Sequence, residues 1–151
     1  MKTAFLAGRL IVAGFYLFSG VNLFLARAKA IGAAAAKGVP FPEVAVPIAA
    51  AFLVIGGLSL LLGWKPSVGI GAIVLFLAPV TIYMHPFWSE SGAERLNDTV
   101  NFTKNIALLG SALMFAAIPK PWIASADAGS ERGEQPPVEM APRREQRSAR
   151  G

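Results

Sequence analysis

The sequence predicts an all-α membrane protein, a bundle of four transmembrane helices followed by a disordered C-terminal tail. Composition is the first observation behind this fold class: of the 151 residues, 54% are hydrophobic and only 15% are charged, whereas soluble domains carry about 25% charged residues. The mean hydropathy of +0.53 agrees. The second observation is that the apolar residues gather in four long stretches that hold few charges. Such a chain has too little polar surface to cover itself in water.

Each of the four stretches has the length that a bilayer requires, about 20 mostly apolar residues within a range of roughly 17–25. They are predicted to be helices because the apolar residues run on without the alternation that membrane barrel strands show. Arg9 interrupts the first stretch, so we expect it to be a retained span and not a cleaved secretory signal. The predicted spans, within a transmembrane domain over residues 1–121, are 3–25, 44–63, 67–85 and 101–118.

The segments between the spans are short. Residues 26–42 are rich in alanine, the best helix former, and end in a Gly-Val-Pro-Phe-Pro turn. We therefore expect a short helix there, lying at the membrane interface. Residues 63–66 are predicted to form a tight hairpin with Trp64 at headgroup depth. Residues 86–100 are predicted to be a polar loop.

The tail over residues 122–151 has ten charges that cancel, so the net charge of +5 belongs to the apolar part of the chain. Its few large apolar residues predict disorder. The chain has no cysteine and one histidine, which excludes disulfides, thiol relays and cysteine metal sites, and we predict no metal site. The scattered basic residues and the neutral tail argue against nucleic-acid binding.

Because consecutive spans alternate in direction, the helix ends sort onto two faces. Face A collects the N-terminus, the 63–66 hairpin and the start of the tail. Face B collects the 26–42 connector, the end of the third span and the start of the fourth. Most polar residues near the spans fall on face B. The candidate pocket residues on this face are Asn22, His85, Trp88, Asn101, Lys104 and Asn105.

Two interpretations of this polar group stay open. Polar residues gather at a membrane boundary because water and headgroups satisfy them there, and Lys104 can extend its amine to the interface. Alternatively they line a pocket, since ionisable residues in membranes usually face the interior. Amide, imidazole and ammonium donors would then suit a quinone headgroup or another carbonyl-bearing lipophile. Arg9, an intramembrane charge two turns into the first span, either extends to the headgroups of face A or pairs inside the bundle.

Several segments of the chain, spread over residues 5–118, resemble the DoxX family of small four-helix membrane proteins. They are 18–22 (FSGVN), 37–40 (KGVP), 56–59 (GGLS), 62–63 (LG), 84–88 (MHPFW) and 101–110 (NFTKNIALLG). The resemblance implies four spans in the bacterial inner (plasma) membrane with both termini in the cytoplasm. It also implies membrane redox chemistry, because relatives are subunits of quinol oxidase and thiosulfate:quinone oxidoreductase complexes. Leu23 and Pro86 stand where relatives commonly carry polar residues.

Three functions remain open, and the residues assign no enzyme class. The first is a redox-associated membrane subunit that binds a quinone, within a membrane redox complex or a homo-oligomer. The second is a non-enzymatic scaffold that packs against partner membrane proteins or organises the lipid bilayer. The third is a transporter for a small solute, which is the least favoured because no acidic residue lies inside a span to couple a proton.

Overall fold

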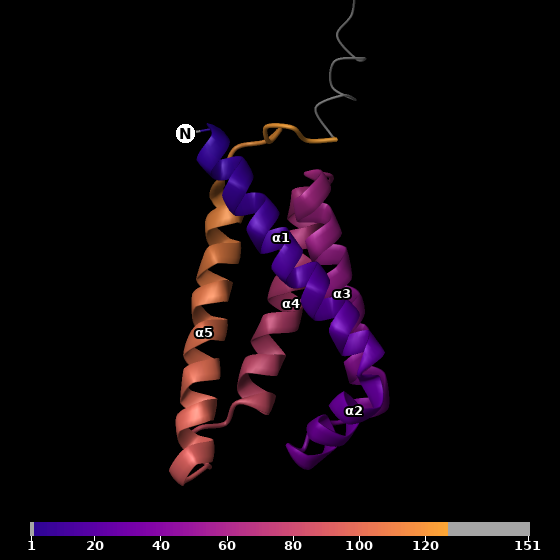
Figure 1. Ribbon diagram of the computed structural model, residues 1–151, viewed down its shortest axis with the longest axis vertical. Coiled ribbons are helices and arrows are strands. Elements are labelled where there is room, and N and C mark those ends of the chain that lie inside the picture. Colours follow the sequence, from indigo (N-terminus) through magenta and orange to yellow (C-terminus); the bar gives the residue numbers. More distant parts are fainter. Residues whose placement is uncertain (1, 127–151) are drawn as a thin grey trace, which may run out of the picture.

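The computed structural model describes residues 2–126 of the chain. Within that range it contains five helices and no strand, and four of the helices are long and apolar enough to cross a membrane. The four long helices lie side by side, while the short one lies across one end of the bundle (Figure 1). The predicted all-α, four-helix membrane fold is confirmed, and the predicted disorder beyond residue 126 lies outside the described residues. The helices are α1 (Lys2–Leu25), α2 (Arg27–Ala36), α3 (Pro42–Leu62), α4 (Pro66–Met84) and α5 (Gly92–Ala117).

The helix α5 begins nine residues earlier than the predicted start of the fourth span at residue 101. The prediction of a loop was therefore wrong for residues 92–100, which are helical, whereas residues 86–91 do form a loop. Glu94 lies in the first turn, where a carboxylate interacts favourably with the helix dipole. The first turns of α5 are polar because they extend past the apolar part of the span. Hydropathy alone does not identify such polar turns as helix. The helices α1, α3 and α4 start and end within two residues of the predicted spans.

The connector between α1 and α3 contains the expected short helix, α2. Its end is set by Gly38, which adopts a positive φ of 75°, a conformation that glycine takes without strain. The amide of Gly38 donates to the carbonyl of Ala35, and the amide of Val39 donates to that of Ala34, both at 3.0 Å. These bonds satisfy carbonyls that the helix end would otherwise leave free.

Close packing between α3 and α4 depends on two glycines in the halves of these helices nearest face A. A Cβ atom added at Gly56 would lie 2.5 Å from Cγ1 of Ile73, and one added at Gly69 would lie 2.4 Å from Cβ of Ser59. Small residues of this kind let membrane helices approach closely. Each glycine therefore makes room for a side chain of the other helix, and the two helices are closely packed near face A.

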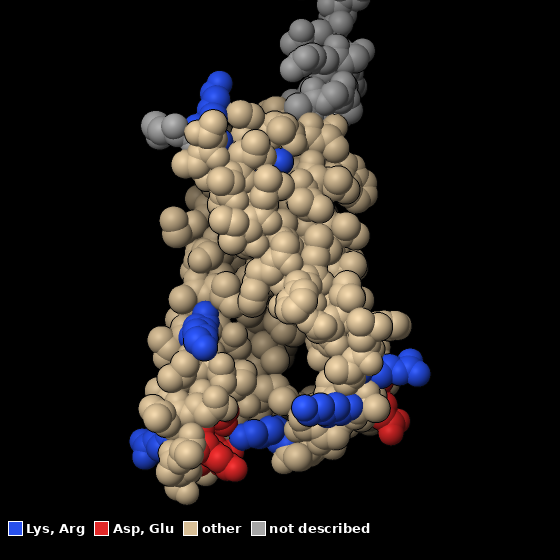
Figure 2. Space-filling view, in the orientation of Figure 1, with Lys and Arg blue, Asp and Glu red and all other residues tan. Residues whose placement is uncertain are grey.

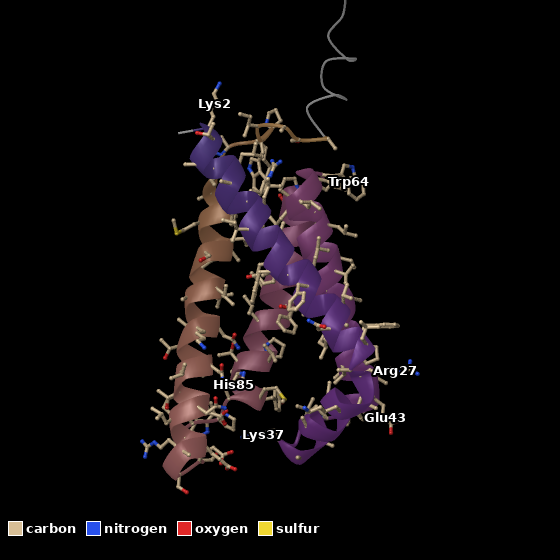
Figure 3. The ribbon with its side chains drawn as sticks, viewed as in Figure 1. Lys2, Arg27, Lys37, Glu43, Trp64 and His85 are labelled. Atoms are coloured by element: carbon tan, nitrogen blue, oxygen red, sulfur yellow. The ribbon has the colours of Figure 1, made fainter. Side chains whose placement is uncertain are left out.

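Most of the charged side chains drawn in Figure 2 lie near the two ends of the bundle, and the acidic ones gather at face B. Lys2 and Trp64 lie at one end, whereas Arg27, Lys37 and His85 lie toward the other (Figure 3). The helix ends thus sort onto two faces as the alternating direction of the spans predicts.

Candidate functional site

The polar residues that meet on face B are centred on Asp98, which is only 5% exposed. Lys37 Nζ donates to Oδ2 of Asp98 at 2.9 Å and to Oε1 of Glu90 at 2.5 Å. Nδ1 of His85 lies 3.2 Å from the other carboxylate oxygen of Asp98. Lys37, His85, Glu90 and Asp98 therefore form one continuous set of contacts, which we call the Lys37 network.

Each member of the Lys37 network is placed by the end of a helix. Lys37 directly follows α2, and His85 directly follows α4, where the next residue, Pro86, disfavours further helix. Glu90 precedes α5, and Asp98 lies in its second turn. The hydrogen bonds that Lys37 donates to Glu90 and Asp98 raise the pKa of its amine above the usual value. The amine is therefore positively charged at physiological pH, as the two ion pairs require.

Among the six candidate pocket residues, His85 joins the Lys37 network. Asn101 instead donates from Nδ2 to Oδ1 of Asn97 at 3.2 Å, one turn earlier on α5. Trp88 packs edge-on against Phe87 and Phe102, with ring centroids 5.3 and 6.0 Å apart.

The other three candidates are outside the Lys37 network. Asn22 is exposed at the end of α1, Lys104 is exposed on α5, and Asn105 is half-buried beside it. Within residues 2–126, none of these three donates a hydrogen bond to the Lys37 network. Their assignment to a pocket stays a prediction.

Three members of the network, Lys37, Glu90 and Asp98, were not among the sequence candidates. In the predicted topology they lie in the 26–42 connector and the 86–100 loop. One signal could have found Asp98, because it shares a helical stripe with Asn101 and Asn105 at spacings of three and seven residues. This stripe can be recognised only if the helix is predicted to begin before residue 98.

A cavity of about 550 Å³ lies beneath α2, between the face-B halves of α3 and α4. This volume falls within the range of roughly 300–1,000 Å³ that is usual for small-molecule sites. Its wall is apolar, built from alanines of α2 and α3 and from larger side chains such as Phe76 of α4. Lys29 and Tyr83 are the members of the wall that carry hydrogen-bond donors. Figure 2 shows the hollow above the charged edge of face B.

The cavity and the Lys37 network are neighbours along the chain. Val39, two residues after Lys37, lines the cavity, and so does Met84, which precedes His85. The network therefore lies at the polar edge of an apolar cavity. Within residues 2–126, no group of three histidine or acidic side chains could hold a metal ion.

A second polar site lies on face A, around Arg9, which is 2% exposed. Its Nη1 donates to the carbonyl of Ile123 at 2.7 Å and its Nη2 to that of Ala124 at 3.0 Å. Ser125 Oγ donates to the carbonyl of Gly63 at 3.0 Å. Of the two interpretations left open by the sequence, the structure thus has Arg9 paired within the protein.

Residues 119–126, which we call the face-A strap, connect the end of α5 to the hairpin between α3 and α4. The prediction that the disordered tail begins at residue 122 was wrong for residues 122–126. Trp122 is buried, and the amide of Ala126 donates to the carbonyl of Leu62 at 3.0 Å. These residues pack because one large aromatic ring and several hydrogen bonds, two of them donated by Arg9, offset the entropy of ordering a short segment.

We expect Arg9→Met to release the face-A strap. Hydrogen bonds to a charged group are worth about 1.5–3 kcal/mol each, and this substitution removes two. Hydrogen–deuterium exchange of peptides covering residues 119–126 should therefore quicken about tenfold or more. Arg9→Lys keeps the charge but not the two-pronged geometry, so its exchange should be intermediate. Unchanged protection in Arg9→Met would show that the strap is held by other contacts.

The model of the DoxX family matches residues 4–86, which is more than half of the chain. The chain belongs to the DoxX family. No curated protein and no solved structure shows significant similarity to it. In this DoxX protein the whole cavity wall lies within the matched range, together with Lys37 and His85. Glu90 and Asp98 lie beyond it, so the acidic half of the Lys37 network is outside the part of the chain that the family model matches.

Proposed function

We propose that this DoxX protein is a redox-associated subunit of the bacterial plasma membrane that binds a quinone-type lipophile in the cavity beneath α2, with both termini in the cytoplasm. The observation that supports this proposal most is the cavity itself, which is apolar and about 550 Å³ in volume. The redox association and the orientation rest on what is known of DoxX relatives.

The residues of the cavity wall suit such a ligand. An apolar wall accepts an isoprenoid tail and the faces of a ring, because burying these groups removes apolar surface from water. Lys29 and Tyr83 supply an ammonium and a phenol hydroxyl, and both groups donate hydrogen bonds that a carbonyl oxygen accepts. When bound, a quinone supplies two-electron redox chemistry, whereas these residues bind and orient it.

The test is the quinone content of the full-length protein purified from its native membrane in mild detergent, measured by mass spectrometry of a solvent extract. A titration with a short-chain ubiquinone analogue then gives the affinity. We expect the purified protein to retain quinone and the analogue to bind saturably. An extract without quinone and an analogue that does not bind would refute the proposal. A stoichiometric crosslinked membrane partner in that case would instead favour a scaffold.

We expect Ala33→Phe to weaken binding of the analogue about tenfold, because a phenyl ring in the cavity wall occupies space that the ligand needs, at a cost of about 1–3 kcal/mol. Ala35→Phe is the matched control, since Ala35 lies on the same helix but outside the cavity wall. Its affinity should equal that of the wild type. Equal affinities for both variants would show that the ligand binds elsewhere.

A further inference from the structure

The helices α3 and α4 are close together near face A and apart near face B (Figure 1). The closest approach is between Gly69 and Ser59, where a Cβ added at Gly69 would lie 2.4 Å from Cβ of Ser59. Toward face B, the cavity separates the two helices, with Ala49 on the α3 wall and Val80 on the α4 wall. The pair is therefore shaped like a V whose apex is fixed by close packing.

The Lys37 network joins the two arms of this V at the open end. Lys37 lies between α2 and α3 and so belongs to the arm of α3. His85, Glu90 and Asp98 belong to the other arm, which consists of α4 and α5. Lys37 crosses from one arm to the other with ion pairs of 2.5 and 2.9 Å. These pairs are partly shielded from solvent, since the side chain of Asp98 is 7% exposed, and shielded pairs are weakened less by salt than exposed ones.

The arm of α4 contains a weak point between the apex and the network. Pro79 lies inside α4 and lines the cavity. Proline has no amide hydrogen to donate to the carbonyl of Leu75, one turn earlier, so the helix bends more easily there. Movement of the last turn of α4 would change the width of the cavity without disturbing the packing at Gly69.

We propose that the Lys37 network is a latch that controls entry of the ligand into the cavity from the membrane. With the ion pairs formed, the two arms are held at one separation, which fixes the width of the hollow that Figure 2 shows. With the pairs broken, the arms separate about the apex, and the cavity opens more widely to the lipid. This inference rests on the proposed function, since it describes regulation of the same site.

The chain contains no cysteine, so introduced cysteines report on the latch without background. We would attach spin labels through Ala35→Cys on α2 and Thr99→Cys on α5, two exposed positions on opposite arms, in lipid nanodiscs. Lys37→Met should lengthen and broaden the measured distance distribution. Arg27→Met is the matched control, because it removes an exposed cation of α2 that is outside the network. Its distribution should match that of the unaltered chain.

A second measurement follows access to the cavity directly. In an Ala49→Cys background, the cysteine lies in the cavity wall, and a lipophilic maleimide should label it about tenfold faster when Lys37→Met is added, which corresponds to ~1.4 kcal/mol in the opening equilibrium. Should Lys37→Met fail to fold, Glu90→Gln removes one of the two partners and is expected to act in the same direction with a smaller change.

The outcomes separate this inference from the proposed function. Distances and labelling rates that stay the same in Lys37→Met and Glu90→Gln would overturn the latch, even if the wild type binds the quinone analogue. Wider distances and faster labelling would support the latch, even if no variant binds the analogue, and in that case only the identity of the ligand would be wrong.

Discussion

Gly69→Ala is expected to destabilise the bundle by about 1–3 kcal/mol, the usual cost of forcing extra atoms into a well-packed interior. The new Cβ would lie 2.4 Å from both Cβ and Oγ of Ser59. Ser59 cannot move aside without loss, because its hydroxyl donates to the carbonyls of Trp64 and Lys65 at 2.7 and 3.1 Å. The helices α3 and α4 must therefore separate at the point where they are closest.

Gly71→Ala on the same helix is the matched control. An added Cβ there meets nothing within 4 Å, and alanine favours helix over glycine by up to about 1 kcal/mol. Its stability should be unchanged or slightly higher. Thermal unfolding of both variants in the same detergent, followed by circular dichroism, measures the difference. If Gly69→Ala and Gly71→Ala unfold at the same temperature, the close packing of α3 on α4 is not a source of stability.

Partial rescue would locate the effect at this contact. Combining Gly69→Ala with Ser59→Gly removes the atoms that collide, so the double variant should be more stable than the sum of the two single changes predicts. Because the same contact forms the apex of the α3–α4 pair, Gly69→Ala should also widen the cavity near face B. The apex and the Lys37 network would then act on one cavity from opposite ends.

The helices α1, α3 and α4 could be predicted from the sequence because the thickness of a bilayer fixes how long an apolar stretch must be. The start of α5 could not be predicted in this way. Residues such as Glu94 and Asp98 lie in polar turns of the same helix. The thickness of the bilayer does not determine the length of these turns, so it cannot be used to predict where they begin. Hydropathy alone therefore recognises the part of a helix that contacts lipid and misses the part that extends beyond it.

The candidate site was harder to predict for a related reason. His85 could be identified because a histidine at the end of an apolar span is unusual. The other members of the Lys37 network come from two other segments, and their approach depends on the packing of the helices. The partners of Arg9 are the backbone carbonyls of Ile123 and Ala124. Every residue has a backbone carbonyl, so the sequence does not indicate which ones accept a hydrogen bond from Arg9. The cavity wall consists of alanines and larger apolar residues that, in the sequence, resemble those of a filled core.

Trp122→Ala is expected to destabilise the bundle by about 3–5 kcal/mol, the usual range for truncating a buried aromatic side chain. Trp122 is 3% exposed. Its ring lies 5.6 Å from that of Phe5 on α1 and 5.7 Å from that of Phe115 on α5, measured between centroids. It therefore fills the space between the first and the last span, so its loss should loosen α5 and free the face-A strap together.

Trp64→Ala is the matched control, since Trp64 also lies at face A but is 51% exposed. It should cost much less than Trp122→Ala in the same thermal unfolding experiment. Trp122→Phe should fall between the two, because it keeps an aromatic ring against Phe5 and Phe115 but loses volume and the indole hydrogen bond to the carbonyl of Ile118. Equal, small losses for both tryptophans would mean that Trp122 is not needed to hold α5 in the bundle. In that case Arg9 would hold a segment that contributes nothing to the stability of the bundle, although burying the Arg9 guanidinium inside an apolar span costs a few kcal/mol. A large loss for Trp122 alone would explain why that cost is tolerated, because Arg9 then holds in place the residue that joins α1 to α5.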